Sequence, residues 1–117
     1  MNIKQQPLVW QEVCSADDLI DNIGYCALLG DRQVALFRLA GSDEIFAIDN
    51  HDPFSGANVL SRGVIGDLKG QLVVASPIYK QHFNLRTGQC LEDGSVSVAT
   101  YPVRIVNGML QVGMSGP

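Results

Sequence analysis

Side chains that could bind a metal or act as an acid or base gather in two short segments, residues 50–57 and 74–83. The first segment contains His51 and Asp52, and the second contains His82. These residues offer two imidazoles and one carboxylate, whereas a structural zinc site needs four well-placed nitrogen or sulfur ligands. We therefore interpret both histidines as solvent-exposed loop residues in preference to metal ligands.

The cysteines and hydroxyl side chains give little support for nucleophilic catalysis. Cys14, Cys26 and Cys90 are odd in number, widely spaced and form no Cys-x-x-Cys pair. This pattern predicts three reduced, mostly buried thiols that pack as small apolar side chains. No Ser/His/Asp or Cys/His pairing has a supporting spacing, and no glycine-rich phosphate loop occurs.

The order of turn residues in the two segments resembles the ligand loops of Rieske iron–sulfur domains. Such a domain has Cys-x-His in its first loop and Cys-x-x-His in its second, so that two thiolates hold one iron and two imidazoles the other. The four ligand positions are occupied here by Asp52, Phe54, Ser76 and Tyr79. The frame around them is kept, with Pro53, Gly56, Gly63, Pro77, Phe83 and Thr87-Gly88. The resemblance implies a Rieske-like domain that holds neither a cluster nor another metal.

Two aromatic rings stand at the former imidazole positions. We expect Phe54 and Tyr79 to pack against each other and the neighbouring prolines, which would plug the space. Partial exposure would make the same residues an apolar tip offered to a partner. The candidate docking residues are Pro53, Phe54, Pro77, Ile78, Tyr79 and Lys80.

Short apolar segments separated by turns at intervals of about 8 to 12 residues are typical of all-β domains. We predict an antiparallel β-sandwich or small barrel with little helix, with Ser15 capping one helical turn. Residues 49–64 should be mostly loop. The expected strands are residues 9–13, 24–29, 33–39, 45–48, 72–75, 83–85, 103–106 and 109–112.

The last two of these strands flank Asn107-Gly108, a strong signal for a two-residue type I′ hairpin turn. A two-residue loop fixes the register, so residues 106, 105, 104 and 103 should pair with 109, 110, 111 and 112. One face would then carry Val103, Ile105, Leu110 and Val112 toward the core, with Arg104 and Gln111 in water.

Length and composition indicate one globular domain. The chain has 117 residues, of which 46% are hydrophobic. We expect the domain to span residues 9–113, with flexible ends at 1–8 and 114–117. The net charge of −4, without a run of basic residues, disfavours nucleic acid. No segment predicts a membrane span or a signal peptide, so we expect a cytoplasmic protein without membrane contact.

Among Rieske-like domains without ligands, the chain is most similar to the small subunits of bacterial NADH-dependent nitrite reductases. The similarity rests on residues 26–31, 34–38, 52–54 and 59–63, and on 75–77 with the lysine, glutamine and phenylalanine that follow. It implies an accessory subunit without catalytic residues or cofactors of its own. Its partner would be the large subunit, in which FAD, an iron–sulfur cluster and siroheme carry electrons from NADH to nitrite and form ammonium.

Other interpretations of this resemblance stay open at the level of sequence. The chain could be a stand-alone Rieske-like module for protein interaction or regulation. It could also be an active Rieske-type [2Fe–2S] electron carrier, which the missing ligands make the weakest of the three. In each case we expect the isolated chain to be a monomer.

Overall fold

The computed structural model describes residues 8–115, which form ten strands and two short 3-10 helices. The helices are η1 (Ala16–Asp18) and η2 (Leu60–Arg62). The strands are β1 (Leu8–Ser15), β2 (Tyr25–Leu29), β3 (Arg32–Arg38), β4 (Ile45–Asp49), β5 (Val64–Leu68), β6 (Gln71–Ala75), β7 (His82–Asn84), β8 (Thr100–Tyr101), β9 (Val103–Val106) and β10 (Met109–Ser115).

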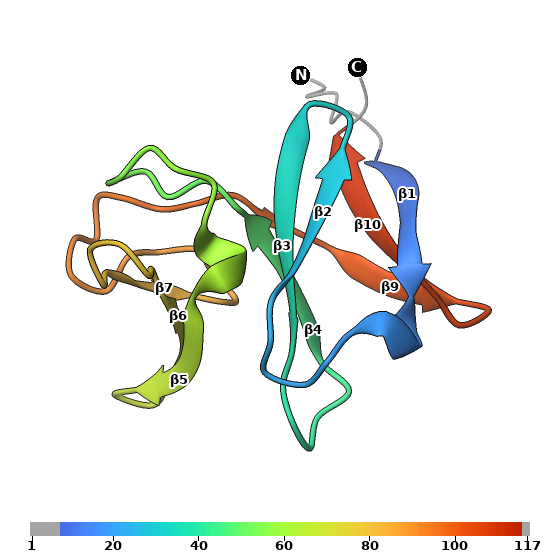
Figure 1. Ribbon diagram of the computed structural model, residues 1–117, viewed down its shortest axis with the longest axis horizontal. Coiled ribbons are helices and arrows are strands. Elements are labelled where there is room, and N and C mark those ends of the chain that lie inside the picture. The colour runs from blue at the N-terminus through green and yellow to red at the C-terminus, as the bar shows by residue number, and fades with distance from the viewer. Residues whose placement is uncertain (1–7, 116–117) are drawn as a thin grey trace, which may run out of the picture.

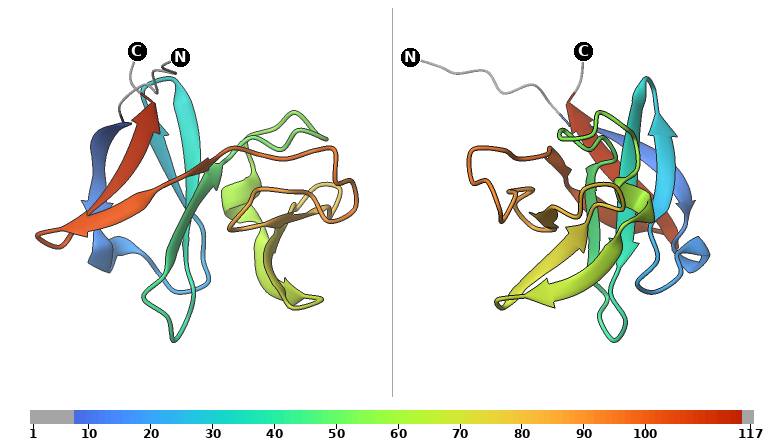
Figure 2. Two further views of the ribbon diagram at one scale, coloured as in Figure 1. Left: turned by 180° about the vertical axis from the view of Figure 1, so that it is seen from behind. Right: turned by 60° about the vertical axis from the view of Figure 1, so that its left-hand side comes forward.

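The strands build three antiparallel sheets with the orders β1-β10-β9, β2-β3-β4-β8 and β5-β6-β7. Figure 1 shows the four-stranded sheet in the middle, with the small β5–β7 sheet on one side and the β1–β10–β9 sheet on the other. In the two views of Figure 2, the chain runs out to the small sheet after β4 and returns after β7. The predicted all-β, antiparallel fold with little helix is confirmed.

Strand β3 explains how three sheets share one domain. Val34 and Leu36 face the cluster between the middle sheet and the β1–β10–β9 sheet. Ala35 and Phe37 face the opposite cluster, which includes residues of the small sheet. All four are fully buried, and a short unbroken apolar run is what a strand covered on both faces requires. The middle sheet therefore connects the two cores.

The C-terminal hairpin has the predicted register, with Val106 opposite Met109 and Val103 opposite Val112. Its predicted core face is only partly correct. Leu110 is fully buried, but its cross-strand partner Ile105 is 50% exposed. Strand β10 lies between two neighbours, whereas β9 is an edge strand and leaves this side chain uncovered.

Several other expectations need correction. Strand β5 was not among the expected strands, and it begins at Val64, the last residue of the segment expected to be mostly loop. The expected tail from residue 114 is wrong for Met114 and Ser115, because both pair with β1, and Leu8 belongs to that strand. Residues 1–7 and 116–117 lie outside the described part.

The cysteines are free, as expected, but they differ in exposure. Cys14 and Cys90 are buried, and burial is the main cause that raises the pKa of each thiol. Cys26 is exposed on β2, contrary to a general expectation of burial. Within residues 8–115, no helix has the length and apolar character needed to cross a membrane.

Candidate functional site

The first candidate loop, residues 50–59, connects β4 to η2 and is closed by its own backbone. The N–H of Asp52 donates to the carbonyl of Ala57 at 2.8 Å, and the N–H of Gly56 returns to the carbonyl of Asp52 at 2.8 Å. The Asp52 carboxylate also accepts the N–H of Phe54, with 2.9 Å to Oδ1. Gly56 has a φ of +77°, a left-handed conformation that glycine adopts without a steric penalty.

The second loop, residues 76–81, connects β6 to β7 and repeats this geometry. The N–H of Ser76 donates to the carbonyl of Gln81 at 2.9 Å, and the N–H of Lys80 returns to the carbonyl of Ser76 at 3.1 Å. The Ser76 hydroxyl accepts the N–H of Ile78 at 3.3 Å. Lys80 stands where the first loop has its glycine, and its φ is +69°. The two loops therefore repeat one turn geometry.

A buried hydrogen bond joins the two loops. The hydroxyl of Ser76 donates to Oδ2 of Asp52 at 2.5 Å, and both side chains are 0% exposed. Burial raises the pKa of the Asp52 carboxyl, but hydrogen bonds from Ser76 and from the N–H of Phe54 outweigh it and lower that pKa overall. Asp52 is thus a buried carboxylate whose charge is balanced by hydrogen-bond donors.

The prediction that Phe54 and Tyr79 pack against each other is wrong. Phe54 is half-buried, and its ring lies 6.1 Å from that of Phe83 at an interplanar angle of 45°. Tyr79 is 62% exposed, and the structure records no aromatic contact to it among residues 8–115. Phe54 has an aromatic core residue within reach, whereas Tyr79 lies on the outer turn of its loop, next to Lys80. The space between the loops is closed by the Asp52–Ser76 pair instead.

Asn50, which sequence reasoning missed, fixes the base of the first loop. It is 1% exposed, and its side-chain amide donates to Oε1 of Gln33 at 3.0 Å and to the carbonyl of Asn58 at 3.1 Å. Its Oδ1 accepts the N–H of Ser61 at 2.6 Å. One buried amide therefore ties the loop to β3 and to η2. The sequence signal that could have identified it is an asparagine two residues after the apolar segment 45–48.

The two histidines do not converge. His51 is exposed, with Nδ1 3.1 Å from Oδ1 of Asn58. His82 is half-buried in β7 and not in a loop as expected, and its Nδ1 lies 2.7 Å from Oε2 of Glu92. Within the described residues, no three His, Cys, Asp or Glu side chains come together as a metal site.

The fold implies a [2Fe–2S] cluster, and the residues at the ligand positions do not fit one. The side chains of Asp52 and Ser76 are hydrogen-bonded to each other. Phe54 has no donor atom and packs toward the core, and the neutral hydroxyl of Tyr79 faces solvent. A cluster that needs two thiolates and two imidazoles has no ligand here.

Sequence comparison establishes the family. The nitrite reductase (NADH) small subunit of Escherichia coli K12 is 50% identical over 103 residues, which are 88% of this chain and 95% of that protein. This chain belongs to that family of small subunits. A family model described as a Rieske-like [2Fe-2S] domain matches residues 9–113. The NMR structure of the E. coli protein NirD has a TM-score of 0.85 at 47% identity, and the match covers 93% of this chain and 99% of that one.

A further relative places this domain in a larger polypeptide. A stretch of the nitrite reductase [NAD(P)H] large subunit of Klebsiella oxytoca is 45% identical over 104 residues, which are 89% of this chain and 11% of that protein. A domain of the present kind is thus part of a large-subunit chain in that organism.

Proposed function

We propose that this chain is a non-catalytic accessory subunit of an NADH-dependent nitrite reductase. The observation that carries the proposal is family membership over nearly the whole chain, combined with ligand positions whose residues do not fit a cluster. FAD, the iron–sulfur cluster and siroheme belong to the large subunit in this proposal, and the complex works in the cytoplasm. The Klebsiella relative supports the partnership, since its small-subunit-like domain is covalently part of a large subunit.

The mechanism open to such a chain is binding. A partner that binds only the folded large subunit stabilises it by mass action, by about 2.7 kcal/mol at a concentration one hundred times Kd. Binding can also order a segment of the large subunit or shield a cofactor edge from solvent. None of these effects needs a catalytic residue in the small subunit.

We propose that docking uses the loop tip, defined as Pro53, Pro77, Ile78, Tyr79 and Lys80. All five residues are exposed, and the two large apolar ones are 43% and 62% exposed. Phe54, a sixth candidate from the sequence, packs toward the buried ring of Phe83 and is therefore not part of the tip. The buried Asp52–Ser76 bond makes the tip rigid, so little conformational entropy is lost on binding.

Titration of the purified large subunit with this chain, followed by calorimetry, tests the function and the tip together. The wild-type chain should bind as a monomer. The double variant Ile78→Ser/Tyr79→Ser should bind about 10- to 100-fold more weakly, because central apolar anchors dominate interface energies. Leu28→Ser is the matched control, since Leu28 is more exposed than either residue but lies on β2, in the middle sheet.

Each outcome has a separate meaning. Equal affinity of a folded double variant and the wild type would contradict docking through the tip. No binding of the wild-type chain would overturn the accessory-subunit proposal and favour a stand-alone module.

A further inference from the structure

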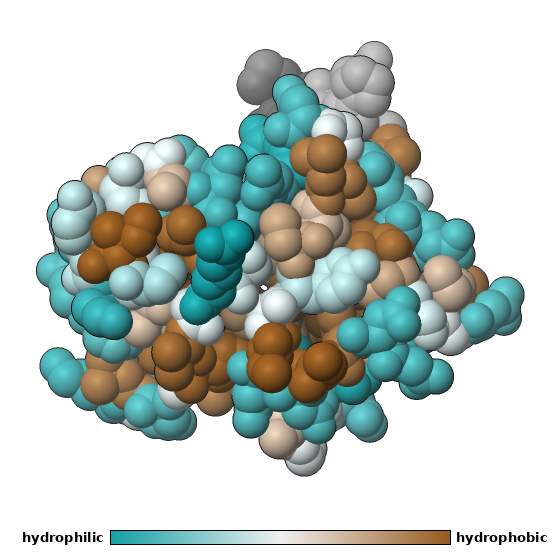
Figure 3. Space-filling view, in the orientation of Figure 1, coloured by the Kyte–Doolittle hydropathy of each residue, from teal (hydrophilic) through white to brown (hydrophobic). Residues whose placement is uncertain are grey.

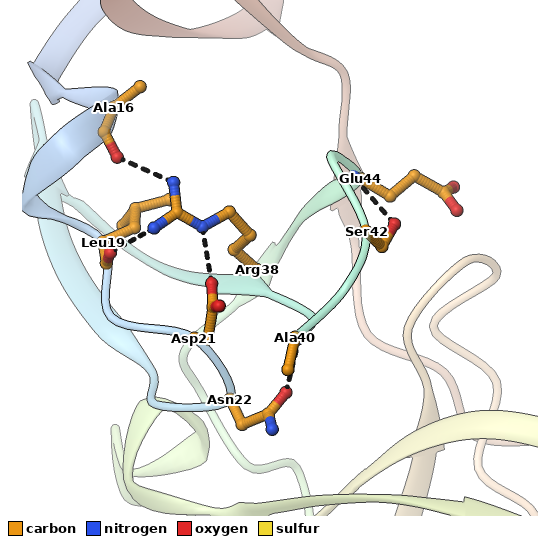
Figure 4. Close-up of polar contacts among 8 residues, drawn as sticks. All are labelled: Ala16, Leu19, Asp21, Asn22, Arg38, Ala40, Ser42 and Glu44. Atoms are coloured by element: carbon orange, nitrogen blue, oxygen red, sulfur yellow. Dashed lines mark hydrogen bonds and ion pairs between the residues drawn. The ribbon is translucent and has the colours of Figure 1, made fainter.

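The connection between β1 and β2 is held by one arginine. Arg38, at the end of β3, donates from Nε to Oδ1 of Asp21 at 2.8 Å, from Nη2 to the carbonyl of Leu19 at 2.6 Å and from Nη1 to the carbonyl of Ala16 at 3.1 Å (Figure 4). Two of these acceptors are backbone carbonyls, so the clamp fixes the path of the main chain and not only a side chain.

Further contacts hold the end of the same connection. The N–H of Asn22 donates to the carbonyl of Arg38 at 2.7 Å. The Oδ1 atom of Asn22 accepts the N–H of Ala40 at 3.0 Å (Figure 4). Asn22 adopts a φ of +64°, which asparagine tolerates better than most residues. Gly24 lies so close to η2 that a Cβ there would be 2.0 Å from the carbonyl oxygen of Ser61. The segment is therefore fixed at both ends and in the middle.

This rigid connection holds two isoleucines in solvent. Ile20 and Ile23 are 64% and 57% exposed, and a 3.1 Å hydrogen bond from the N–H of Ile23 to the carbonyl of Ile20 keeps them on one tight turn. We call this pair the isoleucine knob. Figure 3, in the orientation of Figure 1, shows apolar side chains along the lower edge of the molecule, over the connection before β2 and over the region of β5. The exposed Val64 begins that strand.

The acidic residues near the knob indicate that a partner surface covering it would be basic. Asp17 and Asp18, in η1 on the same connection, are exposed and take part in no ion pair recorded for residues 8–115. Asp21 is already paired with Arg38. A partner that covers the knob would therefore meet an apolar centre, with the exposed carboxylates of Asp17 and Asp18 close to it in the chain. Basic side chains at the rim of an apolar depression would complement this pattern.

We propose that the isoleucine knob is a second docking point for the large subunit, which receives it in an apolar depression bordered by basic side chains. This inference rests on the proposed function. The large subunit is the occupant because a small-subunit-like domain shares one polypeptide with a large subunit in the Klebsiella relative. The contacts of Arg38 fix this backbone before binding. Binding therefore avoids the entropy cost of ordering a flexible loop.

The test titrates the purified large subunit with Ile20→Ser/Ile23→Ser and, separately, with Asp17→Asn/Asp18→Asn. The serine variant should bind at least 10-fold more weakly at every salt concentration. The asparagine variant should bind more weakly at low salt and equally well at high salt, because screening removes the charge contribution. Leu28→Ser again serves as the control and should bind like the wild type. All five side chains changed are exposed, and an amide-resolved NMR spectrum verifies that each variant is folded.

The outcomes separate this inference from the proposed function. Wild-type binding with unchanged affinity of the serine variant would overturn the knob and leave the accessory-subunit proposal standing. Absence of wild-type binding would overturn both. If the wild-type chain forms a dimer in light scattering and the serine variant is monomeric, the knob is a contact between copies of this chain, and the inference is wrong.

Discussion

Asp52→Ala should lower the free energy of unfolding by about 3 kcal/mol, the upper range for leaving buried donors without an acceptor. The substitution removes the acceptor of both the Ser76 hydroxyl and the N–H of Phe54 in a site closed to solvent. Urea denaturation at neutral pH measures the effect. Asp43→Ala, at an exposed position without a recorded hydrogen bond to its side chain, should change stability by less than about 0.5 kcal/mol.

The same carboxylate should contribute to acid sensitivity. The pKa of Asp52 is lower in the folded chain than its ordinary value of 3.8, so the ionised group stabilises the fold above that pH. This stabilisation is lost as the pH falls below 3.8 and through the lowered pKa of the folded state. Asp52→Asn should therefore show a smaller loss of stability than the wild type over that acid range. A loss of equal size in both proteins would contradict a charged Asp52 in the folded chain.

Restoring four ligands should convert the chain into an iron–sulfur protein. The variant Asp52→Cys/Phe54→His/Ser76→Cys/Tyr79→His places two thiols on the buried, facing positions and two imidazoles in the spacing that Rieske loops use. Since both loops keep the same closed turn, we expect stoichiometric [2Fe–2S] uptake on anaerobic reconstitution. Absorption spectroscopy and iron analysis measure it.

The matched control retains Ser76 and carries only the other three changes. It should take up no stable cluster, because one iron would lack a thiolate. Loss of the Phe54 ring removes a contact to Phe83, so circular dichroism is needed to verify that both variants fold. A folded four-ligand variant that binds no iron would show that the loop frame is not preserved.

Local signals were enough for much of the fold. Asn107-Gly108 alone determined the register of β9 and β10, because a two-residue turn leaves one pairing. Strand β5 was not predicted because Gly66 and Asp67 interrupt its apolar pattern. Of its three large apolar side chains, Ile65 and Leu68 are half-buried and Val64 is exposed. An edge strand with one covered face carries a weak pattern.

The candidate site was predictable in its frame and not in its contacts. The proline and glycine spacing located both loops, but it gives no contact between them. The Asp52–Ser76 bond joins residues 24 apart in sequence. It could have been anticipated, since two thiolates that share one iron must be neighbours, and so must the residues that replace them. The Arg38 clamp had no such signal, because its acceptors are mostly backbone carbonyls.

We propose that this chain supports nitrite reduction without a cluster of its own. The most direct measurement purifies the two subunits separately, determines the iron content of this chain, and then follows nitrite-dependent NADH oxidation by the recombined complex. We predict that an iron-free chain binds the large subunit and restores full activity. A chain that carries stoichiometric iron, with activity that rises and falls with that iron, would contradict it.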